Sequence, residues 1–514
     1  MKTSNRILIN TGALYFRMLI TVFITLFSTR IIINVLGVND YGIYNLIAGI
    51  TAMLSFLSGV MTFSSQRFLS FELGVGNIKK LNDVFATSIR LHLYIGILVT
   101  LILEIVGVYI LNYKLNIPLD RIYASNFVLQ FMIIDVFYSI TSAPYDALIN
   151  SNENIEIIAF IYLIESFAKL GIALVLNYIL IDKLIFYSLS LAAVYIFSRY
   201  GKQFYCRFKY KNIRIDRIKT IDNVLLKKMF LFSTWNGFGA FCDIARNQGI
   251  GVVMNLFFGV AINASYAIAI QVSGQLKYFS NSLLMSINPQ ILKAQGAGEK
   301  ERMLELSLLA SKISFFLLSL FSIPLFIEMP FILKIWLGVV PENTVLFCRL
   351  IIVQCLVAQI TMGLHTAIQS IGIIKNYQLI TGSLFLITLP IGYMLLRYGF
   401  SPSVILIISI IMEFIASCFK VIFLKSKSNF VISDFVYKVL FRGTIPILIS
   451  VLIFVAQFYS LQLSNKTLEV LLMFITWVLT TLTSFYYLGL SRYEKKFING
   501  IISSVVNKVI GMNK

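Results

Sequence analysis

The feature that most constrains this chain is a series of apolar runs, each about 20 residues long, that recurs from one end to the other. A helix of that length crosses a hydrocarbon layer about 30 Å thick. Only 13% of the 514 residues are charged, against roughly 25% in soluble domains. We therefore predict an all-α polytopic membrane protein of about 14 transmembrane helices. The predicted spans are 12–36, 42–63, 89–112, 123–149, 157–180, 184–205, 230–258, 261–288, 306–328, 344–368, 377–397, 402–424, 443–461 and 468–490.

The positive charges indicate which ends of the predicted spans face the cytoplasm. With the N-terminus placed inside and the connections alternating, the inside segments hold 30 of the 43 Lys and Arg residues, and the outside segments hold six. Cytoplasmic loops of membrane proteins carry such an excess. We therefore expect a multi-pass protein of the bacterial cytoplasmic (inner) membrane with both termini in the cytoplasm. The net charge of +20 follows from this topology, so nucleic acid is not expected as a partner.

The sequence indicates neither a cleaved signal peptide nor a metal-binding site. The first run, 12–36, is too long for the core of a signal peptide, so we expect a retained span. The five cysteines lie in or beside apolar segments without metal-ligand or CxxC spacing. His92 and His365 stand apart from each other and from any acidic cluster. We therefore expect no metal, no cofactor and no catalytic residue.

The sequence repeats at a constant shift, which takes residue 36 to residue 258. Residues 36–47 (LGVNDYGIYNLI) overlay residues 258–269 (FGVAINASYAIA), and Gly74 and Gly76 then fall on the two glycines of AQGAGE without a gap. Chance matches among Ile- and Leu-rich segments are the alternative. A parallel repeat predicts two six-helix lobes related by an axis along the membrane normal, with a substrate site between them.

The predicted domains follow from this repeat. Residues 1–205 form the N-lobe, and 206–229 form a basic cytoplasmic linker. Residues 230–425 form the C-lobe. Residues 426–514 hold two further helices and a cytoplasmic tail.

Several motifs are familiar in their order and spacing. They are LGVNDYGIYNL after the first span, RFLSFELGVGN after the second, NIPLDR before the fourth and SAPYDALINSNE after it, then residues 232–272, INPQILKAQGAGE and IWLGVVPENT. The chain resembles the polysaccharide-transport branch of the multidrug/oligosaccharidyl-lipid/polysaccharide exporter superfamily, that is, Wzx-type flippases of lipid-linked oligosaccharides. The resemblance covers nearly all of the chain up to the end of the predicted C-lobe.

This resemblance implies a two-lobed transporter that alternates access to a central, usually cationic cavity. The implied cargo is an undecaprenyl-pyrophosphate-linked oligosaccharide, which moves from the cytoplasmic to the periplasmic leaflet. In the related lipid II flippases the last two helices form a hydrophobic groove for the lipid tail, and the two extra spans within 443–490 match that arrangement. Implied partners are the cargo, membrane lipids, a coupling H⁺ or Na⁺, and other polysaccharide assembly proteins.

The residues themselves suggest where such a cargo binds. A pyrophosphate headgroup needs a polar, positively biased path through the membrane, and Arg binds phosphate with two parallel hydrogen bonds. Cations near the span ends, such as Lys202 and Lys420, are counted with the connecting segments, which leaves seven cations within the predicted spans. Ionisable residues there usually face a cavity or a partner. Among them, Lys169 and Lys312 have simpler explanations, a helical ion pair with Glu165 and snorkelling to headgroups. The predicted substrate-binding residues are Arg17, Arg30, Arg246, Gln248, Asn255, Gln271, Gln275, Lys277 and Arg349.

Span 230–258 is the richest in polar residues, and two interpretations of it stay open. Asp243 and Arg246 lie three residues apart, so they can neutralise each other, or Arg246 can line the cavity. The amides nearby suit sugar hydroxyls and suit helix–helix hydrogen bonds equally. We predict Asp243 as the ion-coupling residue, because its protonation would release the charge of Arg246.

Three rival functions follow from the same sequence. A membrane glycosyltransferase or polymerase would need convergent acids with a metal, or a large outside loop, and the sequence has no DxD motif and no such loop. A multidrug exporter of the same superfamily is the closer alternative, although cationic drugs prefer acidic or neutral sites. A lipid II flippase is the third.

Overall fold

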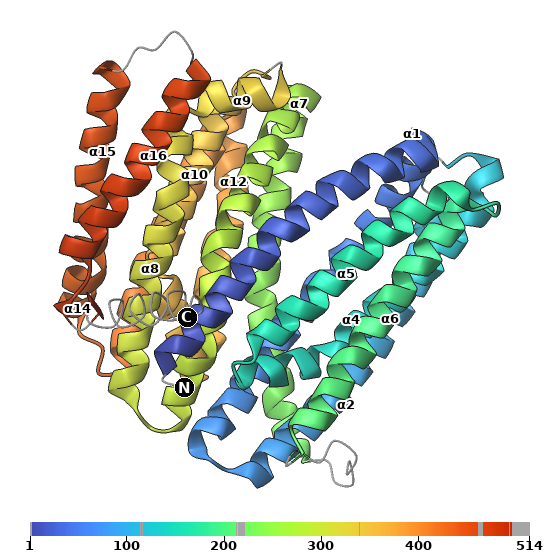
Figure 1. Ribbon diagram of the computed structural model, residues 1–514, viewed down its shortest axis with the longest axis horizontal. Coiled ribbons are helices and arrows are strands. Elements are labelled where there is room, and N and C mark those ends of the chain that lie inside the picture. The colour runs from blue at the N-terminus through green and yellow to red at the C-terminus, as the bar shows by residue number, and fades with distance from the viewer. Residues whose placement is uncertain are drawn as a thin grey trace, which may run out of the picture. The chain divides into compact units, whose positions relative to one another are not determined.

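The computed structural model describes residues 3–113, 115, 117–211, 213, 222–338, 340–460, 466–492 and 494–495. The described chain is almost entirely helical and contains no strand (Figure 1), as predicted. Short π and 3₁₀ turns connect or extend some of the helices. The α-helices are α1 Thr3–Val75, α2 Ile78–Ile102, α3 Val108–Tyr113, α4 Ile122–Ser151, α5 Ile155–Val175, α6 Lys183–Lys209, α7 Asn223–Gly296, α8 Lys300–Ile327, α9 Met329–Leu337, α10 Thr344–Gln359, α11 Met362–Ile371, α12 Lys375–Arg397, α13 Val404–Lys427, α14 Ile432–Phe435, α15 Arg442–Ser460 and α16 Lys466–Ser484.

Helices α1 and α7 are each interrupted by one non-helical glycine. Gly37 has φ 80° in α1, and Gly259 has φ 75° in α7. These angles lie in the region that glycine adopts without steric cost, so the chain bends there without a longer loop. The two glycines fall between the spans predicted separately on either side, and each helical half is longer than the roughly 20 residues that a membrane crossing needs.

The other helices supply most of the remaining spans. Among the residues that the structure describes, nine helices are long and apolar enough to cross a membrane. A tenth span results if α10 and α11, which meet at an angle of 43°, are one broken helix. This is a multi-pass membrane protein, with four more crossings available in the halves of α1 and α7.

The shift that relates the two copies of the sequence repeat also relates the helix boundaries. It takes Gly37 to Gly259, the two interruptions. Helix α2 begins at Ile78, and α8 begins at the position to which the same shift takes Ile78. Helices α4 and α10, which begin at Ile122 and Thr344, are related in the same way. The repeat therefore governs where helices begin and break, beyond the stretch in which sequence similarity is visible.

The helices gather into two compact units. The N-terminal unit comprises Leu8–Gly237 and Leu292–Gly298, and the C-terminal unit is built mainly from Phe238–Ile291 and Glu299–Lys514. In the N-terminal unit, α4 packs on α2 and α6, and α5 packs on α6. In the C-terminal unit, α13 packs on α10 and α12, and α11 packs on α8.

In the N-terminal unit the ends of α1 and α7 cross at a pair of glycines. A Cβ atom added to Gly74 would lie 2.1 Å from the carbonyl oxygen of Lys293. A Cβ atom added to Gly296 would lie 2.1 Å from the carbonyl oxygen of Phe71. The repeat shift takes Gly74 to Gly296 and Phe71 to Lys293. The contact is therefore reciprocal between the two copies of the motif, and only glycine fits at either position.

The last two long helices pack against α8 in the C-terminal unit, and Figure 1 shows α15 and α16 side by side. Phe315 and Leu320 of α8 form a core with Phe454 of α15 and Trp477 of α16. The Trp477 indole donates a hydrogen bond of 2.8 Å to the Leu320 carbonyl oxygen. The buried Lys312 ammonium of α8 pairs with Glu494, beyond α16, at 2.7 Å. An ion pair therefore adds to the apolar packing between α8 and the C-terminal helices.

Candidate functional site

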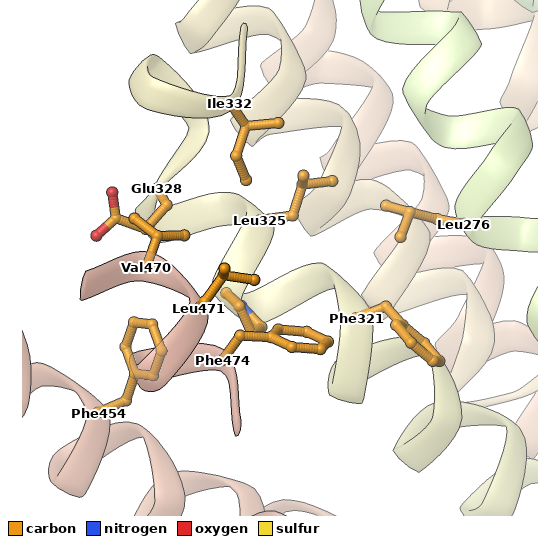
Figure 2. Close-up of a pocket in the computed structure, with 10 residues that line it drawn as sticks. Leu276, Phe321, Leu325, Glu328, Ile332, Phe454, Val470, Leu471 and Phe474 are labelled. Carbon is orange, nitrogen blue, oxygen red and sulfur yellow. The ribbon is translucent and has the colours of Figure 1, made fainter. Parts of the chain in front are cut away.

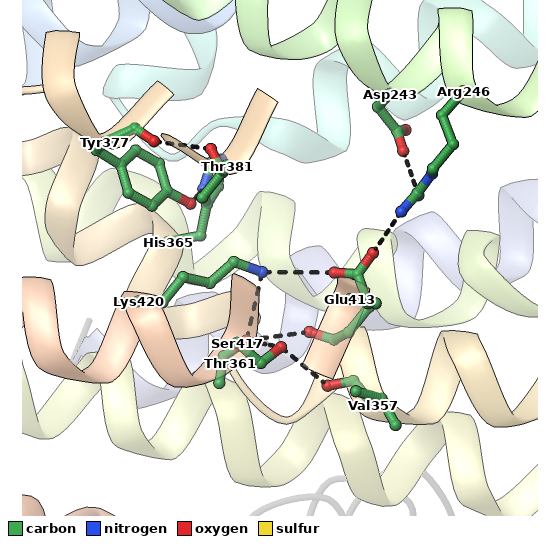
Figure 3. A network of polar contacts seen from close by, with 11 residues as sticks. Asp243, Arg246, Val357, Thr361, His365, Tyr377, Thr381, Glu413, Ser417 and Lys420 are labelled. Atoms are coloured by element: carbon green, nitrogen blue, oxygen red, sulfur yellow. Dashed lines mark hydrogen bonds and ion pairs between the residues drawn. The ribbon is translucent and has the colours of Figure 1, made fainter. Parts of the chain in front are cut away.

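A buried network of ion pairs in the C-terminal unit contains the residue that the sequence singled out most strongly. Arg246 on α7 donates from Nη2 to Asp243 Oδ1 at 2.6 Å and from Nη1 to Glu413 Oε2 at 3.0 Å (Figure 3). Asp243 precedes Arg246 by three residues, which places both on one face of the helix. The side chains of Arg246 and Glu413 are 3% and 5% exposed, whereas that of Asp243 is 43% exposed.

Helix α13 brings a second cation to the network. Glu413 and Lys420 are seven residues apart, which is about two helical turns, so they lie on the same face. The Lys420 ammonium is 3.7 Å from Glu413 Oε1 and 3.4 Å from the Thr361 hydroxyl. Thr361 lies at the break between α10 and α11 and donates to the Ser417 hydroxyl at 3.1 Å. The break between α10 and α11 therefore lies beside Lys420, and the Thr361 hydroxyl there contacts both the Lys420 ammonium and Ser417.

The four ionised side chains balance in formal charge. Arg246 and Lys420 contribute two positive charges, and Asp243 and Glu413 contribute two negative charges. An isolated charge at the centre of a membrane helix costs about 2.5–3.5 kcal/mol on insertion scales. Pairing offsets that cost, so the network is stable as it stands, and an anion that joins it has to compete with Asp243 or Glu413 for Arg246.

The guanidinium of Arg246 has further contacts and one unused donor. Its carbon lies 4.1 Å from the centre of the Phe385 ring, which is a favourable cation–π distance. Its buried Nε has no hydrogen-bond partner among the residues that the structure describes. A buried donor without a partner is unusual in a folded protein. The Arg246 guanidinium is therefore fixed by its packing against Phe385, and its Nε can still donate a hydrogen bond to a further acceptor.

A neutral pair lies beside the ionic network. His365 Nδ1 and the Tyr377 hydroxyl are 2.5 Å apart, and Thr381 donates to the Tyr377 carbonyl oxygen at 2.8 Å (Figure 3). The contact of His365 with Tyr377 joins α11 to α12, whereas the hydrogen bond of Thr381 lies within α12. No group of three or more His, Cys, Asp or Glu side chains in the described part of the chain is arranged to hold a metal ion.

The other predicted site residues do not join this network. Gln248, Asn255, Gln271 and Gln275 are exposed along α7, and Lys277 is partly exposed. Their role in binding stays a prediction. The side chains of Arg17 and Arg30 lie outside the described residues.

The positive charge of Arg349 is accounted for by hydrogen bonds to the C-terminal end of α8. Its Nε donates to the Phe326 carbonyl oxygen at 2.9 Å, and its Nη2 donates to the Ile327 carbonyl oxygen at 3.2 Å. These carbonyls are at the end of α8, where helix carbonyl groups lack partners within the helix and cations are favoured. Its predicted contact with substrate would have to be made in addition to this capping of α8.

The structure also reveals buried cations that the sequence reading had assigned to cytoplasmic segments. Lys420 is one, and Lys202 in the N-terminal unit is another, paired with Asp146 at 3.0 Å. The signal that could have found Lys420 was its spacing from Glu413, with Ser417 between them on the same face. For Lys202 no acid lies on the same helix face in the sequence, because Asp146 belongs to α4.

A separate apolar pocket lies in the C-terminal unit where the last helices meet α8 (Figure 2). Its volume is about 320 Å³, and nine of its ten lining residues are apolar. The tenth, Glu328, lies 3.8 Å from the Lys466 ammonium. The lining residues are Leu276, Phe321, Pro324, Leu325, Glu328, Ile332, Phe454, Val470, Leu471 and Phe474.

Comparison with solved structures identifies the fold, whereas no protein-family model and no curated protein matches the sequence. An outward-facing multidrug resistance MATE family transporter of the MOP superfamily matches with a TM-score of 0.71 and 12% identity, over 83% of this chain and 96% of that one. A MATE transporter in the straight conformation matches with a TM-score of 0.71 and 13% identity, over 83% and 96%. A MOP superfamily transporter from Pyrococcus furiosus, described as having a binding pocket of reverse polarity, matches with a TM-score of 0.68 and 12% identity, over 85% and 97%.

These likenesses extend over nearly the whole length of the other chains and leave about a sixth of this one unmatched. That share is close to the length of residues 426–514. At identities of 11–14% a structural match establishes architecture without establishing cargo. This chain therefore has the fold of the MATE and MOP superfamily transporters.

Proposed function

We propose that this chain is a flippase for an undecaprenyl-pyrophosphate-linked oligosaccharide, the repeat unit of an O-antigen, a capsule or an exopolysaccharide. It would move this cargo from the cytoplasmic to the periplasmic leaflet of the bacterial inner membrane, with both termini in the cytoplasm. Each unpaired sugar hydroxyl costs about 2–7 kcal/mol in hydrocarbon, and a bare phosphate costs far more. A transporter of this fold lowers that cost by offering polar partners to the headgroup.

The observation that carries this proposal is the way in which Arg246 is held. Its two terminal nitrogens donate to two different carboxylates, and its Nε remains free among the described residues. A pyrophosphate presents several oxygens to the same planar fork and can replace a carboxylate without leaving the guanidinium unpaired. The partly exposed Asp243 is the carboxylate through which an anion would first reach the fork.

The apolar pocket supports the proposal from the other end of the cargo. Its walls come partly from α15 and α16, and the unmatched share of the chain is about as long as the segment that contains these helices. An apolar recess beside α8 fits a segment of an isoprenyl chain, as the resemblance to lipid II flippases implies. We assign the tail to this pocket and the pyrophosphate to the network around Arg246.

The test is a leaflet assay in cells that lack this protein. We expect a lipid-linked oligosaccharide to accumulate on the cytoplasmic face and to be cleared by the wild-type chain. Arg246→Ala should clear it at least tenfold more slowly at equal expression, whereas Arg397→Ala, at the exposed end of α12, should behave as wild type. Normal polysaccharide export without a trapped intermediate would show that the proposed function is wrong.

A second candidate is a multidrug exporter, which two observations favour. One structural neighbour is a multidrug resistance transporter, and the half-exposed Asp243 carboxylate would attract a cationic drug. The same deletion strain separates the two functions. Increased sensitivity to cationic drugs with normal polysaccharide would favour drug export.

A further inference from the structure

Glu413 lies between two buried cations and is bound to them through different oxygens. Its Oε2 accepts a hydrogen bond of 3.0 Å from Arg246, and its Oε1 lies 3.7 Å from the Lys420 ammonium (Figure 3). The three side chains are all nearly excluded from solvent. The carboxylate therefore has one tight partner and one looser partner, on opposite sides.

This arrangement bears on the step at which an anion binds Arg246. If a pyrophosphate replaced Glu413 on the guanidinium, the carboxylate would be left buried beside a second anion. An uncompensated buried charge is strongly unfavourable, and two like charges in contact are worse. Binding of the anion in place of Glu413 therefore requires that this carboxylate have another cation to bind.

Lys420 is placed to be that cation. Charge-assisted N–H···O contacts are typically 2.7–2.9 Å, so a shift of about 1 Å would turn the 3.7 Å separation into a direct pair. The Thr361 hydroxyl accepts a hydrogen bond from the Lys420 ammonium at 3.4 Å. Thr361 in turn donates to Ser417, which donates to the Val357 carbonyl oxygen at 3.5 Å. The ammonium is thus held near Glu413 by a chain of hydroxyls.

The other titratable groups around the network are already engaged. The Tyr266 hydroxyl donates to the Asn247 carbonyl oxygen at 2.8 Å, and His365 contacts the Tyr377 hydroxyl. Asp243 carries the same charge as Glu413 and cannot replace a cation. Among the described residues, the cations that pair with Glu413 are Arg246 and Lys420.

We propose that Lys420 is a positioning residue that takes over Glu413 when the pyrophosphate of the cargo binds Arg246. This inference rests on the proposed function and specifies how the charge of Glu413 is compensated when the cargo binds. Lys420 does not touch the cargo. It raises the affinity of Arg246 for the anion by receiving the carboxylate that the anion displaces.

A double-mutant cycle on the full-length chain tests this role. Wild type, Lys420→Gln, Glu413→Gln and the double variant are reconstituted in lipid nanodiscs, and the binding of farnesyl pyrophosphate is measured by titration calorimetry. We expect Lys420→Gln to weaken binding about tenfold, which corresponds to about 1.4 kcal/mol. Glu413→Gln should bind more tightly than wild type, because no charged carboxylate then competes for Arg246. In the Glu413→Gln background, Lys420→Gln should change the affinity by less than about twofold.

The pattern of the cycle distinguishes the possible roles of Lys420. If Lys420→Gln weakens binding by the same factor in both backgrounds, Lys420 contacts the anion directly and the proposal is overturned, while the proposed function stands. If it has no effect in the native background, the proposal is overturned as well. If wild type and Arg246→Ala bind alike, the site at Arg246 fails and the proposed function falls with it.

Melting temperatures show whether a variant has lost its fold, and two further variants test the role of Lys420 independently. Melting temperatures of all proteins are measured in the same nanodiscs. Lys420→Arg keeps the charge and should bind within about threefold of wild type. Thr361→Val removes the hydroxyl that holds the ammonium but leaves the ions in place. It should weaken binding in the native background and leave it unchanged in the Glu413→Gln background, and equal weakening in both would contradict the proposal.

Discussion

Asp243 and Glu413 share Arg246 but differ in their access to solvent. The Asp243 side chain is 43% exposed, whereas that of Glu413 is 5% exposed. A coupling ion has to enter and leave within each transport cycle, so the exposed carboxylate is the better place for it. Asp243 therefore remains our candidate for ion coupling, and Glu413 is the internal counterion.

This assignment predicts the behaviour of Asp243→Asn. The variant keeps an oxygen for Arg246 but has no charge to neutralise, so transport should lose its dependence on a proton or sodium gradient. The rate is measured in vesicles with and without each gradient. Asp434→Asn serves as control, because Asp434 is half-exposed and pairs with Lys438 at an i, i+4 spacing. Full gradient dependence in Asp243→Asn would remove Asp243 from the coupling role.

Of the contacts around Arg246, the one with Asp243 could be anticipated from the sequence, because the two residues are close on one helix. Asp243 and Arg246 are three residues apart, and their mutual pairing was one of the two interpretations considered. The pairing of Arg246 with Glu413 joins α7 to α13, across 167 positions of the chain. Hydropathy places each residue relative to a membrane but says nothing about which helices are neighbours. Lys420 shares α13 with Glu413, but it was counted with a cytoplasmic segment because it lies near the end of its predicted span.

At the scale of elements, the N-terminus of α6 is fixed by an aspartate with two roles. Asp182 Oδ1 accepts hydrogen bonds from the Leu184 and Ile185 backbone N–H groups at 3.0 and 3.1 Å. Its other oxygen accepts a hydrogen bond of 2.7 Å from Arg121, which also binds Asp40. Burial raises the pKa of Asp182, but the Arg121 guanidinium and the helix N–H groups lower it more, so its pKa lies below the ordinary value.

This geometry predicts a difference between two helix caps. Asp182→Asn keeps an oxygen for the helix but loses the charge that Arg121 binds, and should destabilise the protein by about 1–3 kcal/mol. Asp222→Asn is the matched control, because Asp222 caps α7 with the same two contacts and is exposed. Its effect should be a few tenths of a kcal/mol. Both are compared by unfolding in detergent, and equal losses would contradict a role for the ion pair.

The same contact predicts a dependence on pH. Because the pKa of Asp182 is lower in the folded than in the unfolded state, its contribution is present above the unfolded pKa, near 4, and is lost as the pH falls through the folded pKa. The wild type should therefore lose more stability below about pH 4 than Asp182→Asn does. An unchanged difference between the two proteins across this range would show that the ion pair does not contribute.

The crossing of α1 and α7 makes a prediction about packing between elements. Gly74→Ala would place a Cβ atom 2.1 Å from the Lys293 carbonyl oxygen, so the backbones have to separate. We expect a large fall in melting temperature. Gly49→Ala is the control on the same helix, since a Cβ there meets nothing within 4 Å. Gly74→Ala with Gly296→Ala should cost less than the sum of the single changes, because both enlarge one contact. Additive losses would indicate two independent sites.

The interruptions of α1 and α7 could be predicted from the local sequence. The helix ends were predicted less well, because α1 continues to Val75 and α2 begins at Ile78, beyond the predicted limits 63 and 89. The breaks at Gly37 and Gly259 fall between spans that hydropathy alone had separated. The close approach at Gly74 could not be inferred from its own surroundings. Its match with Gly296 in the repeat was visible, but a repeat does not reveal that its two copies touch. That contact joins segments far apart in the chain, and nothing local in the sequence records it.

At the scale of the whole molecule, we propose that the chain joins a transporter fold to an additional helix pair, α15 and α16. The neighbours of that fold leave about a sixth of this chain unmatched. Helices α15 and α16 bind α8 through the core around Trp477 and through the pairing of Lys312 with Glu494. The apolar face of α8 would be equally stable against lipid, since lipid tails are as apolar as these side chains. Lys312 and Glu328 would lose their ion partners, Glu494 and Lys466, which lipid tails cannot replace.

A chain that ends after Lys427 and carries Lys312→Met and Glu328→Gln should therefore insert and fold but fail to clear the lipid-linked intermediate. It retains the network around Arg246, and it should bind farnesyl pyrophosphate through that site. It lacks the walls that Phe454, Leu471 and Phe474 give to the apolar pocket, so the long isoprenyl tail has no recess beside α8. The full-length chain with Lys312→Met and Glu328→Gln is the control and should transport normally. If the shortened chain clears the intermediate at the rate of the control, the tail does not use this pocket, and the helix pair has a different purpose.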